Sequence, residues 1–125
     1  MGGELVLIVD DNELNLKLTR ALLMKAGYDV RTASDVPRAL SVLEAFRPRL
    51  ILMDIQLPGV DGLQFTKTLK TDPTTHDIKI LAVTAYSSTG DEEKALVAGC
   101  DGYVTKPIDT RALPGLVRKH LDGLA

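Results

Sequence analysis

The chain has 125 residues, of which 45% are hydrophobic and 26% charged, the composition of one globular domain. A formal net charge of −2 gives no electrostatic footprint for direct nucleic-acid binding, and no apolar run approaches the roughly 20 residues that span a bilayer. The amino terminus lacks the basic and apolar regions of a signal peptide. A single cysteine, Cys100, excludes an internal disulfide and favours a reducing, cytoplasmic setting.

Short apolar runs recur along the chain and predict strands. Leu5–Val9, Leu50–Met53 and Ile80–Val83 are too short for core helices and read as strands buried on both faces, as in a parallel sheet. Two weaker candidates, Asp29–Ala33 and Gly102–Thr105, are expected nearer the edges of the sheet.

Helical patterns lie between these runs. The first has Leu14, Leu18 and Leu22 on one face, with Asn12 as the expected N-cap and Gly27 as the stop. The next spans Val36 to Leu43 after an N-cap at Ser34 or Asp35. Further helices are predicted at 61–70, at about 90–98 after a capping box that begins at Thr89, and at about 110–122, where Pro114 and Gly115 predict a late or irregular start.

The alternation of strand and helix predicts an α/β fold, with a parallel sheet covered by helices on both faces. Ligands of such sheets bind outside the carboxyl ends of the strands. The residues at or just after the predicted strand ends are Asp10, Asp11, Asp54, Thr84, Lys106 and Pro107. Three carboxylates, a hydroxyl and an ammonium group are therefore expected to converge on one rim.

Three neighbouring carboxylates repel one another and need a proton or a cation to offset their charge. Oxygen ligands with open positions suit Mg2+. A cation, Lys106 and the Thr84 hydroxyl together form a receptacle for a phosphoryl group, which a carboxylate can accept as an acyl phosphate. Each residue alone has an ordinary reading as a turn, a cap or a solvated charge, so the prediction depends on their joint placement.

Four motifs at these positions resemble the receiver domains of two-component response regulators. The resemblance covers about residues 4–122, so that residues 1–125 are identified as a single receiver domain. The motifs are Leu7-Ile8-Val9-Asp10-Asp11-Asn12-Glu13, Leu52-Met53-Asp54-Ile55-Gln56-Leu57-Pro58-Gly59-Val60-Asp61-Gly62, Ala82-Val83-Thr84-Ala85 and Gly102-Tyr103-Val104-Thr105-Lys106-Pro107. The resemblance implies a flavodoxin-like (βα)5 doubly wound parallel sheet of five strands in the order 2-1-3-4-5.

The resemblance also implies roles for the residues of the rim. Asp54 would accept the phosphoryl group, while Asp10, Asp11, Asp54 itself and the backbone carbonyl of Gln56 would hold Mg2+. Lys106 would pair with the phosphoryl oxygens, or with Asp54 in the resting state. The Lys106–Pro107 peptide is expected to be cis.

The implied switch consists of Thr84 and Tyr103. The Thr84 hydroxyl would move towards the phosphoryl group and the Tyr103 ring would turn inwards, which changes the surface formed by the fourth helix, fifth strand and fifth helix. A half-exposed strand tyrosine that does not move is the ordinary alternative for Tyr103.

The implied partners are a sensor histidine kinase or histidine phosphotransfer protein and a downstream protein target. Such a regulator catalyses only its own phosphorylation and dephosphorylation. The sequence resembles single-domain regulators of cell division, which predicts a stand-alone protein without a DNA-binding output. A receiver module of a hybrid histidine kinase and a receiver-like binding module that is not phosphorylated remain alternatives. A haloacid-dehalogenase-type phosphatase is disfavoured because Gln56 stands where that family has its second acid.

Overall fold

The computed structural model describes residues 4–54, 56–57, 60–84, 89–105 and 111–122. Of the elements in these ranges, no helix has the length and apolar character needed to cross a membrane. Lys106 and Pro107, including the expected cis peptide between them, lie outside the described residues.

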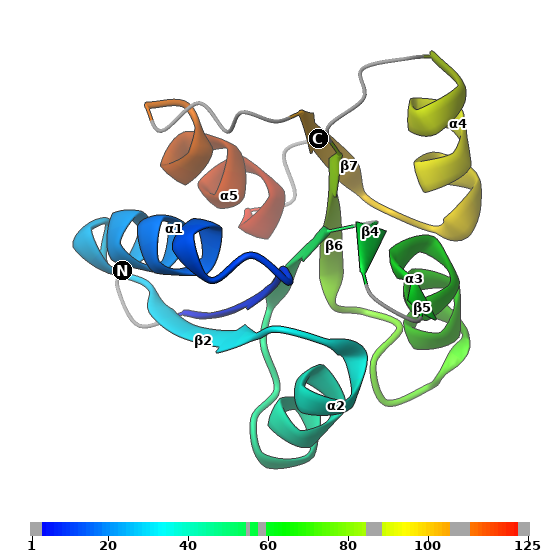
Figure 1. Cartoon of the computed structure of the whole chain (residues 1–125), viewed down its shortest axis with the longest axis horizontal. Helices are drawn as coiled ribbons and strands as arrows, with labels where there is room; N and C mark the ends of the chain where they lie inside the picture. Colours follow the sequence, from blue (N-terminus) through cyan, green and yellow to red (C-terminus); the bar gives the residue numbers. More distant parts are fainter. Residues whose placement is uncertain (1–3, 55, 58–59, 85–88, 106–110, 123–125) are drawn as a thin grey trace.

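Strands and helices alternate along the described chain (Figure 1). The strands are β1 (Leu5–Val9), β2 (Asp29–Ala33), β3 (Leu50–Asp54), β4 (Gln56–Leu57), β5 (Val60–Asp61), β6 (Lys79–Thr84) and β7 (Gly102–Thr105). The helices are α1 (Glu13–Lys25), α2 (Val36–Ala45), α3 (Gly62–Thr71), α4 (Thr89–Ala98) and α5 (Leu113–Leu121).

Five of the strands form one parallel sheet in the order β2-β1-β3-β6-β7. This is the predicted 2-1-3-4-5 order of a flavodoxin-like fold, with the two weaker strand candidates at the edges, as expected. The central strand β3 is buried along its whole length, because helices cover both faces of the sheet. The carboxyl ends of β1, β3, β6 and β7 consequently share one rim.

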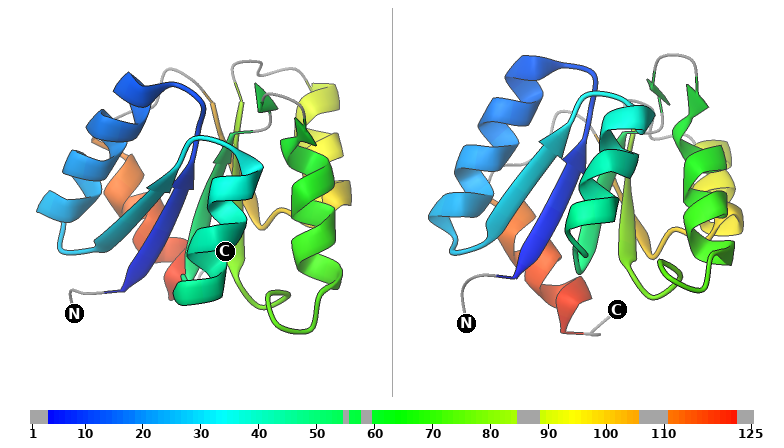
Figure 2. Two further views of the ribbon diagram at one scale, coloured as in Figure 1. Left: turned by 60° about the horizontal axis from the view of Figure 1, so that its bottom comes forward. Right: turned by 90° about the horizontal axis from the view of Figure 1, so that it is seen from below.

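Two apolar cores lie on opposite faces of this sheet (Figures 1 and 2). Helices α1 and α5 cover one face, where Leu23 and Val117 pack against strand residues such as Leu52. Helices α2 and α3 cover the other, where Ala39 and Phe65 contribute. Helix α4 lies beside α3 at the β7 end of the sheet.

The buried face of α1 differs from the face that the leucine spacing indicates. Leu14 and Leu18 are 65% and 60% exposed, whereas Leu16 and Leu23 are buried. Helix α1 is apolar on two sides, and the sheet covers the side that carries Leu16 and Leu23. The Leu14 and Leu18 side chains are therefore left in solvent.

The N-caps predicted for the first two helices are confirmed, whereas α4 begins at Thr89 itself, so the capping box expected there stays a prediction. The Asn12 side chain accepts a hydrogen bond from the Asn15 backbone N–H (3.0 Å), and Asp35 caps α2 in the same way through Arg38. Gly27, which follows α1, has a φ of 100°, a left-handed conformation that glycine adopts without strain. The late start of α5 is also confirmed: this helix begins at Leu113, and Pro114 falls in its first turn.

One local element was not predicted from the sequence. Between β3 and α3 the chain forms a small antiparallel pair, β4 with β5, in which Gln56 is opposite Asp61. Helix α3 therefore begins at Gly62, directly after the pair. The pair continues the chain from the carboxyl end of β3, so it extends from the same rim as Asp54.

Candidate functional site

Asp10 and Asp11 follow the carboxyl end of β1. The Asp10 backbone N–H donates to the carbonyl of Ala33 (3.1 Å), which extends the pairing with β2 by one residue. The Asp10 carboxylate accepts a hydrogen bond from the Asn12 backbone N–H (2.9 Å) and is 4% exposed. Asp11 is exposed. The sequence thus places one acid within the rim and the next at its solvent side.

Asp54 is the last residue of β3, the central strand. It pairs in register with Val83 of β6 and is 2% exposed. The strand is held by its buried apolar residues on both faces, so the position of the Asp54 backbone is determined by the core and not by a loop. A carboxylate on such a rigid support is well placed for chemistry that requires a fixed nucleophile.

The structure brings the three predicted carboxylates together. One oxygen from each of Asp10, Asp11 and Asp54 lies within 4.8 Å of the others. At an effective dielectric constant of about 20, two unit charges at this distance repel by about 3 kcal/mol. The cluster therefore favours a cation.

The ligands available in this cluster fit Mg2+. All three are oxygen atoms, which suits a hard cation, and protein Mg2+ sites often use only a few carboxylates and leave other positions to water or substrate. Asp11 is exposed, so the cluster is open to solvent on the side of this residue.

Thr84 ends β6, the strand next to β3, and is 2% exposed. It pairs in register with Thr105, while Ala82 pairs with Tyr103 of β7. Since alternate residues of a strand share a face, Thr84 and Tyr103 lie on the same face of the sheet, on neighbouring strands. The Tyr103 residue is 38% exposed.

Gln56 and Lys106 are the other two residues predicted to belong to the site. Gln56 lies in β4, two residues after Asp54, but only its backbone is described. Lys106, one residue after β7, lies outside the described residues.

Two leucines of α1 near this site are exposed, which the sequence did not predict. Leu14 lies in the first turn of α1, three residues after Asp11, and Leu18 is one turn further along. Their spacing of four residues marks a shared face, but it does not indicate whether the sheet or solvent covers that face.

Cys100 is not part of the rim. It is 6% exposed and lies on the α2–α3 side of the sheet, with its Sγ atom 3.9 Å from the Thr66 hydroxyl oxygen. Burial raises the pKa of the Cys100 thiol, which disfavours the reactive thiolate. This residue therefore belongs to the core.

Comparison with known proteins gives a consistent result. The model of the response regulator receiver domain family matches residues 6–118. The polar-differentiation response regulator DivK of Brucella anthropi is 44% identical over 116 residues, which are 93% of this chain and 94% of that protein.

Solved structures agree with the fold. A putative response regulator from Chloroflexus aurantiacus has a TM-score of 0.91 at 30% identity, covering 96% of this chain and 98% of that one. The receiver domain of the sensor histidine kinase PA1611 from Pseudomonas aeruginosa has a TM-score of 0.86 at 31% identity, covering 97% and 99%, and was solved with a magnesium ion coordinated in its active site cleft. The match over residues 6–118 and the shared fold show that the chain belongs to the response regulator receiver domain family.

Proposed function

We propose that this chain is a phosphorylation switch in which Asp54 accepts a phosphoryl group in a Mg2+-dependent reaction. The observation that carries the proposal is the cluster of Asp10, Asp11 and Asp54, whose carboxylate oxygens lie within 4.8 Å of one another at the carboxyl ends of two adjacent strands. A buried acid beside two others has little structural value unless a cation or a substrate offsets the repulsion.

The proposed donor is a phosphohistidine of a sensor kinase or histidine phosphotransfer protein. A carboxylate oxygen of Asp54 attacks the phosphorus atom, the phosphorus–nitrogen bond breaks, and its electron pair remains on the histidine nitrogen. The product is an acyl phosphate on Asp54. Asp10, Asp11, Asp54 and the Gln56 carbonyl would hold Mg2+, which neutralises charge on the phosphoryl oxygens when it is bound.

The proposed readout uses Lys106, Thr84 and Tyr103. Lys106 would pair with the phosphoryl oxygens, and the Thr84 hydroxyl would donate to one of them. The Tyr103 ring, on the same face of the sheet, would then turn inwards. This change would alter the surface of α4, β7 and α5 and so the affinity of a downstream protein.

The exposed stripe of Leu14 and Leu18 supports a protein donor. These side chains begin three residues after Asp11, so an apolar helix of the donor that packs on them would lie beside the rim. We propose that this stripe is the contact for the phosphohistidine-bearing protein.

We further propose that the chain acts as a single, stand-alone cytoplasmic receiver domain without direct nucleic-acid binding. Its match to 94% of the length of the Brucella anthropi response regulator supports this assignment. The likeness to the receiver domain of the sensor histidine kinase PA1611 favours the alternative, a receiver module of a hybrid kinase.

The test is the intact mass after incubation with acetyl phosphate, with and without Mg2+, for the wild type and the Asp54→Asn variant. We expect the wild type alone to gain one phosphoryl group, and only with Mg2+. A folded wild-type protein that gains no phosphoryl group would leave a receiver-like binding module as the better description.

A further inference from the structure

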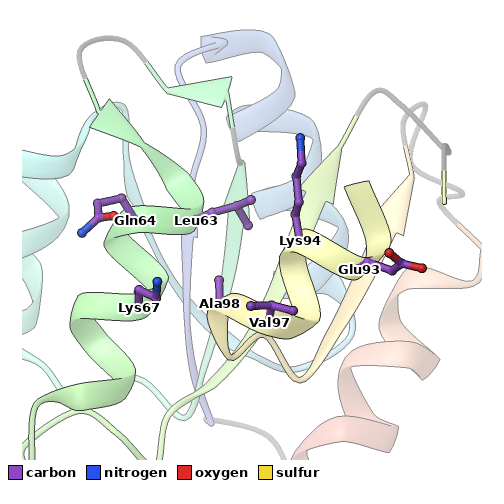
Figure 3. A pocket seen from close by; sticks show the side chains of 7 residues that line it. All are labelled: Leu63, Gln64, Lys67, Glu93, Lys94, Val97 and Ala98. Carbon is purple, nitrogen blue, oxygen red and sulfur yellow. The ribbon is translucent and has the colours of Figure 1, made fainter. Parts of the chain in front are cut away.

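A groove of about 450 Å3 lies between α3 and α4 (Figure 3). Leu63 and Lys67 of α3 contribute to one wall, and Lys94, Val97 and Ala98 of α4 contribute to the other. It lies on the flank of α4 that faces α3, so it is separate from the α4–β7–α5 surface described above.

The middle of the groove is apolar. Figure 3 shows the Leu63 side chain pointing from α3 towards α4, with Val97 and Ala98 on the facing side. Val97 is 81% exposed, more than any other large apolar side chain in the described part of the chain. Single exposed apolar residues are ordinary, whereas adjoining ones mark surfaces that bind a partner, and Val97 shares this groove with Leu63 and Ala98.

The charges beside this apolar surface are mainly positive. Lys67 and Lys94 are exposed, one on each helix. Glu93 also lines the groove, but Figure 3 shows it extending from the side of α4 away from α3. A partner helix that lies along the groove would therefore meet the ammonium groups of both lysines, which are complementary to carboxylates.

We propose that the α3–α4 groove binds an amphipathic helix of a partner protein that carries acidic residues beside its apolar face. Both walls are helices, and the backbone groups of a helix are hydrogen-bonded within it. An extended peptide, which needs backbone hydrogen bonds from the edge of a sheet, would find none along these walls. A helical partner makes its own backbone hydrogen bonds, so it needs only apolar and charged side-chain contacts from the groove. The helical partner thus fits this groove better than a strand does.

The position of the groove connects it to the proposed switch. Helix α3 begins at Gly62, eight residues after Asp54, and α4 begins at Thr89, five residues after Thr84. A movement of Thr84 towards a phosphorylated Asp54 is expected to shift α4 relative to α3 and change the width of the groove. This coupling rests on the proposed function, whereas the docking itself does not.

The test uses a synthetic helical peptide with leucines on one face and glutamates flanking them, labelled for fluorescence anisotropy. A second peptide has lysines in place of the glutamates. We expect saturable binding of the acidic peptide, with backbone amide chemical-shift changes in α3 and α4, and weaker binding of the lysine peptide. Val97→Asp should weaken binding about tenfold or more, because it places a carboxylate in the apolar centre.

Matched variants separate docking from loss of fold. Leu96→Asp is the control, since Leu96 is 56% exposed on the same helix but does not line the groove, and its binding should equal that of the wild type. Lys67→Glu combined with Lys94→Glu should reverse the preference between the two peptides. Circular dichroism of every variant confirms that the helices are retained.

The results decide whether the α3–α4 groove is the binding site of the peptide. Binding that is lost in Val97→Asp and retained in Leu96→Asp supports the proposal, while no saturable binding, or shift changes confined to α1 or to β7 and α5, would overturn it. Repeating the titration after acetyl phosphate treatment tests the coupling. Unchanged affinity on a protein phosphorylated at Asp54 refutes the coupling alone, and absence of phosphorylation refutes the switch while the docking result stands.

Discussion

Asp54 and Thr84 end adjacent strands of the sheet, one residue out of register. Asp54 pairs with Val83, so Thr84 extends one position beyond it along β6, and each residue is 2% exposed. The Thr84 hydroxyl is therefore close along the rim to the end of β3 without being opposite Asp54. If Asp54 accepts a phosphoryl group as proposed, we expect this hydroxyl to donate to it.

We therefore predict that Thr84→Ala separates phosphorylation from switching. Asp54 should still gain a phosphoryl group from acetyl phosphate, because the acid cluster does not include Thr84. The shift changes that phosphorylation causes in β7 and α5 of the wild type should become much smaller, as measured by amide NMR spectra. Thr84→Ser, which keeps the hydroxyl, should restore them. Full wild-type shift changes in Thr84→Ala would contradict this role.

The exposure of Tyr103 provides a second readout. The sequence contains no tryptophan, so Tyr103→Trp introduces a unique probe at a position that is 38% exposed. We predict that phosphorylation lowers the quenching of this tryptophan by acrylamide, since the ring turns inwards. The same variant carrying Asp54→Asn is the control and should show constant quenching. Equal quenching before and after phosphorylation would indicate a tyrosine that does not move.

The two apolar sides of α1 should respond differently to substitution. Leu23 is fully buried, so Leu23→Ala should lower the free energy of unfolding by about 3 kcal/mol. Leu18 is 60% exposed, so Leu18→Asp should change it by less than about 1 kcal/mol, which is the scale of helix propensity differences. Urea denaturation measures both.

Leu18→Asp should nevertheless slow phosphotransfer from a histidine phosphotransfer protein while leaving labelling by acetyl phosphate unchanged. The small donor does not need the stripe, whereas a protein donor does. Met24→Asp, at the far end of the same helix, is the charge-matched control, since Met24 is an apolar residue that is 48% exposed. A Leu18→Asp protein that accepts phosphoryl groups from both donors at the wild-type rate would rule out the stripe as a docking contact.

The strands and the rim were predictable from the sequence because buried parallel strands require apolar residues on both faces. Runs such as Leu50–Met53 are too short to form a core helix, and each ends beside a polar residue. Asp10, Asp11 and Asp54 come directly after two of these runs, so their place on the rim was predictable. The strand order is different in kind: it came from the family resemblance, since alternation alone does not order the strands.

Two features show what local pattern does not determine. The exposed face of α1 depends on which of two apolar sides the sheet covers, a tertiary choice that leucine spacing does not encode. The β4–β5 pair contains two residues in each strand, too few for a periodic signal.

An ion pair away from the site should be important for stability. The Lys70 Nζ atom donates to the Asp101 carboxylate (2.8 Å) and to the Ile78 carbonyl (2.8 Å), and the same carboxylate oxygen accepts from the Ile80 backbone N–H (2.8 Å). These bonds tie α3 to the start of β6 and to the residue that precedes β7. The side chains of the pair are only 18% and 25% exposed.

We predict that Asp101→Ala lowers the free energy of unfolding by about 2 kcal/mol, because it leaves a half-buried ammonium group and an N–H without their shared acceptor. Asp29→Ala is the control, since its pair with Arg31 has side chains that are 37% and 48% exposed. It should cost less than about 0.5 kcal/mol in urea denaturation. Similar losses for the two variants would contradict this difference.

His120 should make stability depend on pH. Its ring packs on the backbone of β7, where a Cβ atom added at Gly102 would approach its Cε1 atom to 2.9 Å. Burial lowers the pKa of the His120 imidazole; nearby Asp101 acts in the opposite direction, and Lys119 and Lys79 reinforce the lowering. The folded protein therefore holds this ring neutral at pH values where an unfolded chain would protonate it.

As the pH falls, the unfolded state binds the proton at a higher pH than the folded state does. The contribution of His120 to the free energy of unfolding is therefore full above the unfolded pKa of about 6.5, and it is lost as the pH falls through the lower pKa of the folded state. Below that window, Glu4 and Asp77 add their own losses, because pairing with Arg118 and Arg47 lowers their pKa values. We predict that His120→Gln, which does not titrate, flattens the unfolding free energy as the pH falls below about 6.5 and leaves the loss due to Glu4 and Asp77 unchanged. Urea denaturation across this range measures the slope, and equal slopes for the variant and the wild type would show that His120 does not contribute.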